Sequence, residues 1–410
     1  MKRVILINIL LLLAIFSGHG QNFIFVEGKI IDKESGEGVS FAHIGLCDKA
    51  IGTVSNVNGE FELKVPPYYL KDSVCISAIG YKSYSGLIQT LEKIDPLTIE
   101  LVPETSILQE VIISDEAITG KRVLEKAINR IPRNNPIRPF LLEGYYRDYL
   151  KKDNEYISFL EAAISLQDMG VNSLESKSRI QINQLRSGDN YKDYYNKYLH
   201  KDEEDTIKEV LEGESTFYWG NEFSNMRYHD PIRNRYENVP FLGVFANFYE
   251  SSYQFEIAYY TYVDEEEVYV IKFKPNDLYK YHHVQADGEI YIRVKDYGIL
   301  KFNYNFYVSK FGDRKKWYEL NLEYREYQEQ LFLKYISYVN YFKIYTGVEI
   351  ADLYLYREFF VTDIHYPHFE RIPKSKTIDK SIPLHMHDAP NDIDFWTSYN
   401  VILLEKPLKD

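Results

Sequence analysis

Residues 52–65 read GTVSNVNGEFELKV, two short runs on either side of Asn58-Gly59. An Asn-Gly pair supplies the positive φ angles that a two-residue hairpin turn needs, so it predicts a tight connection between antiparallel strands. Glu60–Val65 alternates polar and apolar side chains, which is typical of a strand with one buried face. We expect Phe61 to fill the core beneath this strand. The proline pair that follows ends the strand because proline has no amide hydrogen to donate.

The sequence on both sides continues in the same way, as short apolar runs separated by polar turns. Together with residues 60–65, about seven strands fall within about eighty residues, and that density predicts a β-sandwich. Gly80 is expected to let the chain bend between two of them. The other strands are expected at Phe25–Ile31, Phe41–Leu46, Gly52–Val57, Val74–Ile79, Tyr81–Ile88 and Leu97–Leu101.

Several motifs in this region resemble a known module. They are Gly28-Lys29-Ile30-Ile31-Asp32, Gly38–Ile44, Gly52–Asn56, Asn58–Phe61 and Ile79-Gly80-Tyr81. In order and spacing they resemble the carboxypeptidase-regulatory-like domain, which also stands at the N-terminus of many TonB-dependent outer-membrane receptors of Gram-negative bacteria. The resemblance implies a transthyretin-like (prealbumin-like) sandwich over residues 21–104, without an active site of its own.

The rest of the chain does not continue as a receptor. Residues 108–113 (LQEVII) resemble the stretch that follows the module in receptors, but only about three hundred residues remain, without a regular series of lipid-facing strands. Further motifs resemble carboxypeptidase-like regulatory domain-containing proteins of Gram-negative envelopes, and that resemblance implies no activity. These motifs are Tyr145-Tyr146-Arg147-Asp148, Glu161-Ala162-Ala163, Asp394-Phe395-Trp396 and Tyr399-Asn400.

The N-terminus predicts export. Lys2 and Arg3 precede an apolar run over Val4–Phe16, and small residues before Gln21 are typical of a signal-peptide cleavage site. We expect a signal peptide at residues 1–20, with an uncleaved anchor as the alternative. Export places the protein in the periplasm, at the outer membrane or on the cell surface, with peripheral outer-membrane association possible. The net charge of −13 argues against nucleic acid as a partner.

The two cysteines, Cys47 and Cys75, leave the redox state open. Export permits a disulfide. The alternation of the strands that contain them predicts that both side chains point away from the core. Outward cysteines argue weakly against a bridge, although two of them can still meet on adjacent strands.

Residues 105–139 are expected to form a linker strand and a helix. The helix is predicted over 116–131, ended by Pro132 and followed by an extended connector over 134–139. Residues 140–410 are interpreted as a second β-rich domain. Residues 170–215 are polar and charged, and they predict a long, acidic and partly mobile surface insertion within it.

Long alternating segments return after residue 250 and predict one curved antiparallel sheet, similar to the half-barrel of periplasmic lipoprotein carriers. We expect turns at Asp287-Gly288 and Tyr297-Gly298, and a C-terminal tail over 365–395 that packs on the sheet with Trp396 as its anchor. The strands are expected at Tyr253–Tyr262, Val268–Lys274, Gly288–Val294, Ile299–Val308, Trp317–Arg325, Leu331–Phe342 and Tyr354–Ile364.

Catalytic signatures are not found in the sequence. It has neither the His-Glu-x-x-His pattern of zinc hydrolases nor a Gly-x-Ser-x-Gly elbow nor a phosphate-binding glycine loop. The best metal candidates are His385, His387 and Asp388, because two imidazoles on one face of an extended segment could hold zinc. The alternative is a solvated tail. No cofactor is expected.

Aromatic stripes are the remaining signal, since aromatic residues make up 16% of the chain. If they line the concave face of the sheet, they could bind an apolar or saccharide ligand, and core packing is the alternative. The candidates are Tyr253, Phe255, Tyr291, Phe302, Tyr304 and Phe306. The leading hypothesis is a non-enzymatic envelope protein that binds or organises other envelope components. The alternatives are a carrier of a lipid or other apolar ligand, and a hydrolase with an unrecognised site.

Overall fold

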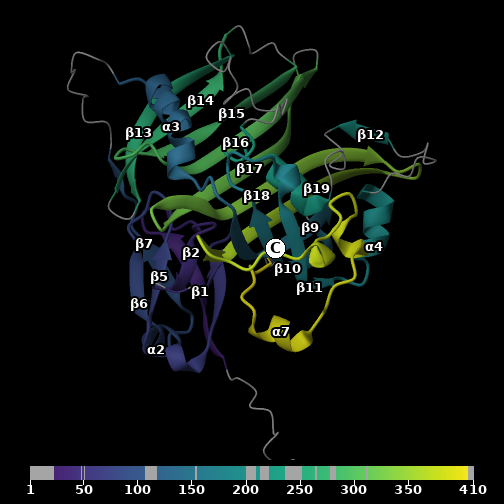
Figure 1. Cartoon of the computed structure of the whole chain (residues 1–410), viewed down its shortest axis with the longest axis horizontal. Helices are drawn as coiled ribbons and strands as arrows, with labels where there is room; N and C mark the ends of the chain where they lie inside the picture. Colours follow the sequence, from purple (N-terminus) through teal and green to yellow (C-terminus); the bar gives the residue numbers. More distant parts are fainter. Residues whose placement is uncertain are drawn as a thin grey trace, which may run out of the picture.

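The computed structural model describes residues 23–47, 49, 51–106, 118–152, 155–199, 209–212, 221–235, 252–263, 266–277, 283–310 and 313–404. The predicted signal peptide and the stretch at 108–113 lie outside these residues. The described chain is mainly β structure, in a small sandwich and a large curved sheet (Figure 1). No helix in this part of the chain combines the length and the apolar character needed to cross a membrane.

The N-terminal sandwich has the seven strands expected from the sequence. A three-stranded sheet of order β4-β1-β7 faces a four-stranded sheet of order β3-β2-β5-β6. Phe61 is buried between them, and Gly59 has the positive φ angle expected at a tight turn. The predicted hairpin is wrong, however, because the strands on either side of Asn58-Gly59 belong to different sheets and pair with other strands. The strands are β1 Ile24–Asp32, β2 His43–Leu46, β3 Gly52–Val54, β4 Glu60–Val65, β5 Ser73–Ser77, β6 Tyr84–Leu87 and β7 Thr98–Leu101, with helical turns η1 Pro67–Tyr69 and α2 Ile88–Leu91.

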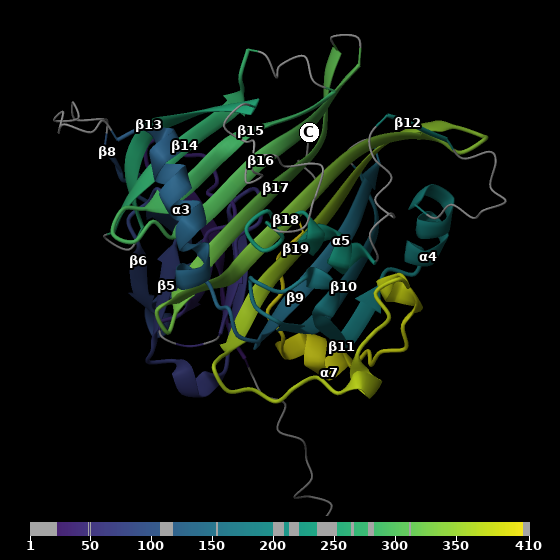
Figure 2. The same cartoon turned by 45° about the horizontal axis from the view of Figure 1, so that its top comes forward.

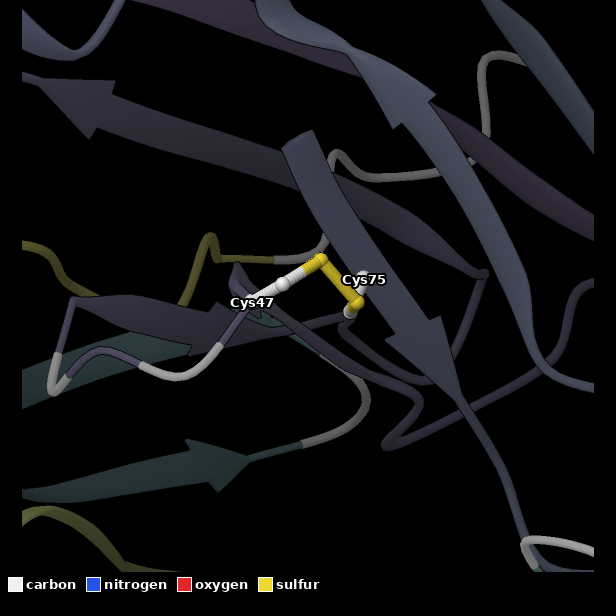
Figure 3. Close-up of a disulfide and its surroundings, with 2 residues drawn as sticks. All are labelled: Cys47 and Cys75. Atoms are coloured by element: carbon white, nitrogen blue, oxygen red, sulfur yellow. A yellow bond between two sulfur atoms is a disulfide. The ribbon is translucent and has the colours of Figure 1, made fainter. Parts of the chain in front are cut away.

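Cys47 and Cys75 form a disulfide on the surface of the sandwich (Figure 3). The side chain of Cys75 points away from the core, as the alternation predicts. The bridge forms nevertheless because β2 and β5 are neighbours, and the pairing of Gly45 with Cys75 leaves the two Cα atoms 5.2 Å apart. Strand pairing, which sequence alone does not fix, therefore decides the question that the pattern left open.

The second unit is an antiparallel sheet whose described strands follow the order β11-β10-β9-β19-β18-β17-β16-β15-β14-β13-β8, with β12 paired to β18. Its edge strand β8 comes from the linker after the sandwich. The strands are β8 Thr105–Ser106, β9 Phe140–Lys152, β10 Glu155–Asp168, β11 Arg179–Ser187, β12 Glu209–Glu212, β13 Tyr253–Val263, β14 Glu266–Pro275, β15 Val284–Arg293, β16 Ile299–Lys310, β17 Asp313–Tyr327, β18 Gln330–Tyr345 and β19 Ile350–His365.

The seven strands expected after residue 250 are all present as β13–β19, but one of the predicted turns is wrong. Asp287 and Gly288 lie within β15, where Gly288 pairs with Tyr304. A Cβ atom at position 288 would stand 2.0 Å from the carbonyl oxygen of Asn303, so glycine is needed here for close strand packing. Tyr297, at φ 60°, forms the second predicted turn as expected.

The expected mobile insertion over 170–215 is wrong for its described first half. Residues 179–187 form β11, which pairs with β10 along the edge of the sheet. Ile180 is fully buried there, and Tyr191 and Tyr195 are buried beyond it. The alternation of isoleucine with polar residues in β11 is a strand signal that the high local charge conceals. This region also contains η2 Glu175–Lys177, α4 Tyr191–Tyr194 and the π-helical turn η3 Tyr195–Leu199.

The predicted linker helix is α3, Gly120–Asn134, and Pro132 does not end it. Thr119 caps its N-terminus by accepting a hydrogen bond from the amide of Arg122 (3.3 Å). The helix continues past Pro132 and ends at Asn135, whose backbone is extended. A proline in the last turn removes one hydrogen bond without breaking the helix, because the buried apolar side of α3 holds it on the sheet.

The large sheet has two covered faces. The inner face carries α3 and α5 (Glu222–Tyr228), and the sheet curves around them (Figure 2). The outer face packs against the sandwich and the end of the C-terminal tail, whereas Leu384, earlier in the tail, belongs to the core that contains α5. The tail, residues 366–404, contains the short helices η5 Lys374–Lys376, η6 Leu384–Met386 and α7 Ile393–Ser398.

The end of the tail, residues 392–404, lies between the two units. Asn400 pairs with Lys64 on β4, the edge of the sandwich, accepting from its amide (2.7 Å) and donating to its carbonyl (3.2 Å). On the other side, Arg147 of β9 donates to the carbonyl of Ile402 (2.9 Å). Trp396 is buried in the same contact, as predicted, with the Arg186 guanidinium 4.4 Å from its ring. The tail therefore joins the sandwich to the sheet.

Candidate ligand pocket between the two domains

A pocket of about 320 Å³ lies where the sandwich meets the large sheet. One wall is the bend between β5 and β6, residues 77–83. The other wall is one end of the sheet, where β13, β15 and β17 finish and β14, β16 and β18 begin. Ligand sites occur preferentially at such domain junctions. The pocket therefore exists only while the two units are docked.

The sandwich wall is held in place by backbone bonds. Gly80, at φ 91°, turns the chain, and its carbonyl accepts from the amide of Glu104 (2.8 Å). The carbonyl of Glu104 accepts in turn from the Thr261 hydroxyl on β13 (2.8 Å). Tyr81 donates to Asp32 (2.8 Å), and burial together with this carboxylate raises the pKa of Tyr81 to about 12. This wall is therefore fixed to both units.

Arg293 and its acidic partners dominate the sheet wall. Its guanidinium donates to Asp296 (2.6 Å) and to Glu266 (3.0 Å), and it also contacts Glu326. These partners neutralise its charge, and they keep it protonated even though burial alone would lower the pKa of Arg293.

Glu323 carries the second set of ion pairs at the pocket. It lies 3.0 Å from the ammonium of Lys301 and 3.6 Å from that of Lys334. Burial alone would raise the pKa of Glu323, but the two lysines together bring it below its usual value. One carboxylate thus serves two cations, which leaves this part of the pocket positive.

Arg325 differs from the other pocket cations because it has no carboxylate within 4.0 Å among the described residues. Its Nε atom is buried, and no described group accepts a hydrogen bond from it. Burial lowers the pKa of Arg325, and the negative charge of Asp363 opposes this effect only in part. A buried Nε–H donor without an acceptor among the described groups is unfavourable.

The positive charges of Lys334 and Arg325 also act on a residue of the sandwich, His43. His43 of β2 faces the sheet, with its ring 5.6 Å from that of Phe360 on β19. Burial lowers the pKa of His43 well below its usual value, and the charges of Lys334 and Arg325 lower it further. The positive charges of Lys334 and Arg325 therefore reach the sandwich across the junction, whereas three carboxylates surround Arg293 elsewhere in the pocket.

This geometry favours the binding of an anion. The guanidinium of Arg325 has donors in a planar fork that matches the two oxygens of a carboxylate or phosphate. Ser77 and Ser83 add hydroxyl groups on the opposite wall. A pocket of this volume accommodates a small organic acid or the end of a chain, and not a whole lipid.

The aromatic residues singled out in the sequence do not line this pocket. Four of the six belong to the core of the inner face, each at most 5% exposed, and Phe255 is half-buried beside them. The four buried residues are Tyr253, Phe302, Tyr304 and Phe306. The side chains of α3 and α5 pack on this face, and the Tyr304 hydroxyl donates to the carbonyl of His229 (3.1 Å). A ligand role for these residues stays a prediction.

Tyr291 lies on the opposite face from the other five. Ile290 and Ile292 face the inner core, so the alternation of β15 turns Tyr291 outward. Its hydroxyl donates to Glu289 (2.8 Å) and lies 3.4 Å from the hydroxyl of Tyr259. The expectation that Tyr291 shares a face with Phe302 is therefore wrong, because Phe302 pairs with Ile290 and not with Tyr291.

The structure does not bring the histidines of the tail together as a metal site. His385 and His387 are not on an extended segment, since His385 lies in η6. The ring of His385 packs against Tyr191 and Tyr195, at 5.5 and 4.4 Å between centroids. His387 Nε2 instead faces the carbonyl oxygens of Asp379 and Ile382. No group of three ligands that includes His385, His387 or Asp388 occurs among the residues described.

Arg325 was not among the residues that the sequence pointed to. It lies in a regular alternating strand, where an outward arginine is ordinary. The pocket is created when the bend at residues 77–83 docks on a strand about 250 positions later, and no local pattern records that contact.

Comparison with known protein families agrees with the domain predicted for the N-terminal part of the chain. Residues 26–113 match the family model described as a CarboxypepD_reg-like domain. This segment of the chain is therefore a carboxypeptidase-regulatory-like domain, as its motifs predict. No curated protein matches the chain.

Three solved structures share low similarity with the chain. The first is a LolA superfamily protein from Nitrosomonas europaea, with 10% sequence identity and a TM-score of 0.24; the match covers 65% of this chain and 100% of that chain. The second is a DUF1329 family protein from Desulfovibrio piger, with 10% identity and a TM-score of 0.27; the match covers 61% of this chain and 94% of that chain. The third is a protein from Bacteroides fragilis described as putative membrane-associated and of unknown function, with 9% identity and a TM-score of 0.15; the match covers 84% of this chain and 98% of that chain. None of these descriptions names an enzyme. TM-scores this low carry no functional argument.

Proposed function

We propose that this chain is a non-enzymatic, exported envelope protein that binds a small anionic ligand between its two domains. The single observation that carries this proposal is Arg325, a cation in an interdomain pocket without a carboxylate partner among the described residues. An anion would provide the acceptor that its buried Nε lacks, and would balance a charge whose burial is otherwise unfavourable.

Two further features support an exported binding protein. The predicted signal peptide and the Cys47–Cys75 disulfide both agree with an oxidising compartment. The carboxypeptidase-regulatory-like domain brings no active site of its own, and here it supplies one wall of the pocket. The domain therefore forms one half of the proposed binding site.

The test is a calorimetric titration of the mature chain, residues 21–410, with three probes at physiological ionic strength. The probes are inorganic phosphate, citrate and N-acetyl-triglycine, and N-acetyl-triglycinamide serves as the uncharged counterpart of the peptide. We expect binding of at least one anion, and we expect N-acetyl-triglycinamide not to bind where N-acetyl-triglycine does. The pattern among the probes distinguishes a phosphate ligand from a carboxylate ligand.

Two variants on one strand make the test specific. Arg325→Met removes the cation of the pocket and should reduce anion affinity at least tenfold. Arg314→Met is the matched control, because Arg314 lies at the other end of β17 and already pairs with Asp287 (2.6 Å). The proposal fails if none of the anions binds at millimolar concentration, or if R325M and R314M bind them equally well.

A further inference from the structure

One cluster of metal-ligand side chains lies outside the anion pocket. Glu143 on β9 and Asp363 and His365 on β19 each offer one ligand atom, and these atoms all lie within 4.8 Å of one another. It is the only such group found among the described residues. These three residues differ from the metal candidates of the sequence analysis, which were His385, His387 and Asp388.

Strand register builds this cluster. Glu143 and Asp363 are directly opposite each other, and His365 follows two residues later on the same strand. A bulge between Val361 and Asp363 shifts the register at this point, so that Asp363 and His365 face the same side as Glu143. The sequence separation of the two strands is about 220 residues, which explains why no local motif reveals the site.

The distances suit a shared cation better than direct bonds. His365 Nε2 lies 3.5 Å from the Asp363 oxygen and 3.8 Å from the Glu143 oxygen, too far for hydrogen bonds. Ligands about 2.1 Å from a tetrahedral ion stand roughly 3.4 Å apart, close to both values. The Nε2 atom is buried and makes no hydrogen bond within the described part of the chain.

The charges point the same way. Two carboxylates placed directly opposite on neighbouring strands repel each other. Arg325 is the cation that acts on Asp363, but the two do not form an ion pair within 4.0 Å among the described residues. Burial raises the pKa of Tyr399 in the tail, and the negative charge of Glu143 raises it further. A divalent ion between the carboxylates would remove their repulsion.

We propose that Glu143, Asp363 and His365 bind one divalent cation of the zinc class. The three side chains are between 37% and 45% exposed, so an ion can enter and water can complete its coordination. Two carboxylate oxygens and one imidazole are a donor set that suits Zn²⁺. This proposal does not require that the pocket bind an anion, although Asp363 also interacts with Arg325 through its charge.

The experiment is a titration of the metal-free mature chain with ZnCl₂, followed by calorimetry and by the thermal unfolding temperature. We expect one ion per chain and a higher unfolding temperature. His365→Ala and Asp363→Asn should each weaken binding at least tenfold. Circular dichroism spectra of the variants confirm that they are folded.

Two controls distinguish this site from other metal-binding groups. His368→Ala removes an exposed histidine three residues away and should leave zinc affinity unchanged. Arg325→Met should retain zinc binding, so that failure of one proposal is separable from failure of the other. Equal zinc affinity in H365A and in the wild type, or the absence of any zinc binding, would overturn the assignment.

Discussion

Arg325 stands apart from the other buried arginines of the described chain. Arg147 contacts Glu358, Arg227 lies 2.7 Å from Asp168, and Arg357 lies 3.1 Å from Asp148. Each of these pairs is almost inaccessible to solvent, where removal of one partner would leave an unpaired charge. Among the arginines of the described ranges, only Arg325 lies at a pocket without such a carboxylate partner. Residues that cost stability and yet persist are candidates for function.

The first prediction concerns the stability cost of Arg325. Replacement by methionine keeps most of the apolar stem and removes the unpaired charge, so R325M should unfold at higher denaturant concentration in the absence of ligand. We expect a gain of roughly 1 kcal/mol in the free energy of unfolding. Urea unfolding of both proteins measures it. A loss of more than 1 kcal/mol would show that Arg325 is a structural residue.

Glu222, on the inner face of the sheet, is a buried acidic residue with one oxygen that lacks a hydrogen-bond donor among the described groups. The amide of Leu384 donates to one of its oxygens (2.9 Å), while no described group donates to the other. Burial raises the pKa of Glu222 to about 7, the negative charge of Asp148 adds to this effect, and Arg357 opposes it. The folded protein therefore keeps a proton that the unfolded chain releases at lower pH.

The second prediction is a pH-dependent stability difference. Because the pKa of Glu222 rises from 4.5 to about 7 on folding, its contribution to stability falls as pH increases through this window. Glu222→Gln mimics the protonated form, so its stability relative to wild type should increase by about 3 kcal/mol between pH 4.5 and pH 7.5. Denaturant unfolding at a series of pH values measures this difference.

The comparison with wild type is needed because His229 has the opposite effect. Burial lowers the pKa of His229 to about 4, so its neutral form stabilises the protein above its unfolded pKa of 6.5, and that stability is lost as pH falls to about 4. The effects of Glu222 and His229 on the free energy of unfolding have opposite signs over the same pH range, so they partly cancel in the wild-type protein. If the curves of E222Q and wild type run parallel, Glu222 ionises normally and the interpretation is wrong.

At the scale of elements, the disulfide gives the third prediction. It joins β2 to β5 across a sequence separation of 28 residues. In the chain-entropy description, a loop of this length stabilises the folded state by roughly 3 kcal/mol. The double variant Cys47→Ala, Cys75→Ala should lose about this amount in urea unfolding. The oxidised and reduced wild type should differ in the same direction, and equal stability would contradict the prediction.

Regular alternation is what made the elements predictable. The segments that form β13–β19 alternate apolar and polar residues over part of their length, although β14, β18 and β19 also contain runs of consecutive buried residues. These seven strands lie side by side in the sheet in the order of the sequence. The failures have physical causes. β11 alternates, but its charged surroundings conceal it, and Pro132 is tolerated because packing holds the last turn of α3.

The candidate sites were not predictable in the same way. Glu143 and His365 meet because β9 and β19 are neighbours in the sheet, although the sequence separates them by more than two hundred positions. Arg325 acquires its environment from the docking of a different domain. Such contacts depend on tertiary arrangement, whereas sequence patterns record only local periodicity.

At the scale of the whole molecule, the junction couples the two units. The sandwich contributes Val54 and Phe41 to a core that also contains Tyr335 and Phe360 of the sheet and Ile402 of the tail. Phe41 stacks on Tyr335 with 5.1 Å between ring centroids. A hydrophobic junction of this kind, with hydrogen bonds from the tail to both sides, should make the two units unfold together.

The fourth prediction tests this coupling. The mature chain should unfold in a single calorimetric transition, and a chain truncated after residue 391 should unfold in two. Asn400→Ala removes only the two bonds to Lys64 and should lower the single transition temperature without dividing it. Two transitions in the intact chain would show that the units are independent. One transition in the truncated chain would show that the tail is not needed.

The position of the tail in the chain also has a consequence for biogenesis. Residues 392–404 follow both surfaces that they join, so the junction is complete only after this segment has been translated. Domains generally fold as units, the N-terminal one first. The sandwich can thus fold early, while its fixation on the sheet requires residues 392–404. A chain interrupted before residue 392 would carry both walls of the pocket but not the segment that secures them.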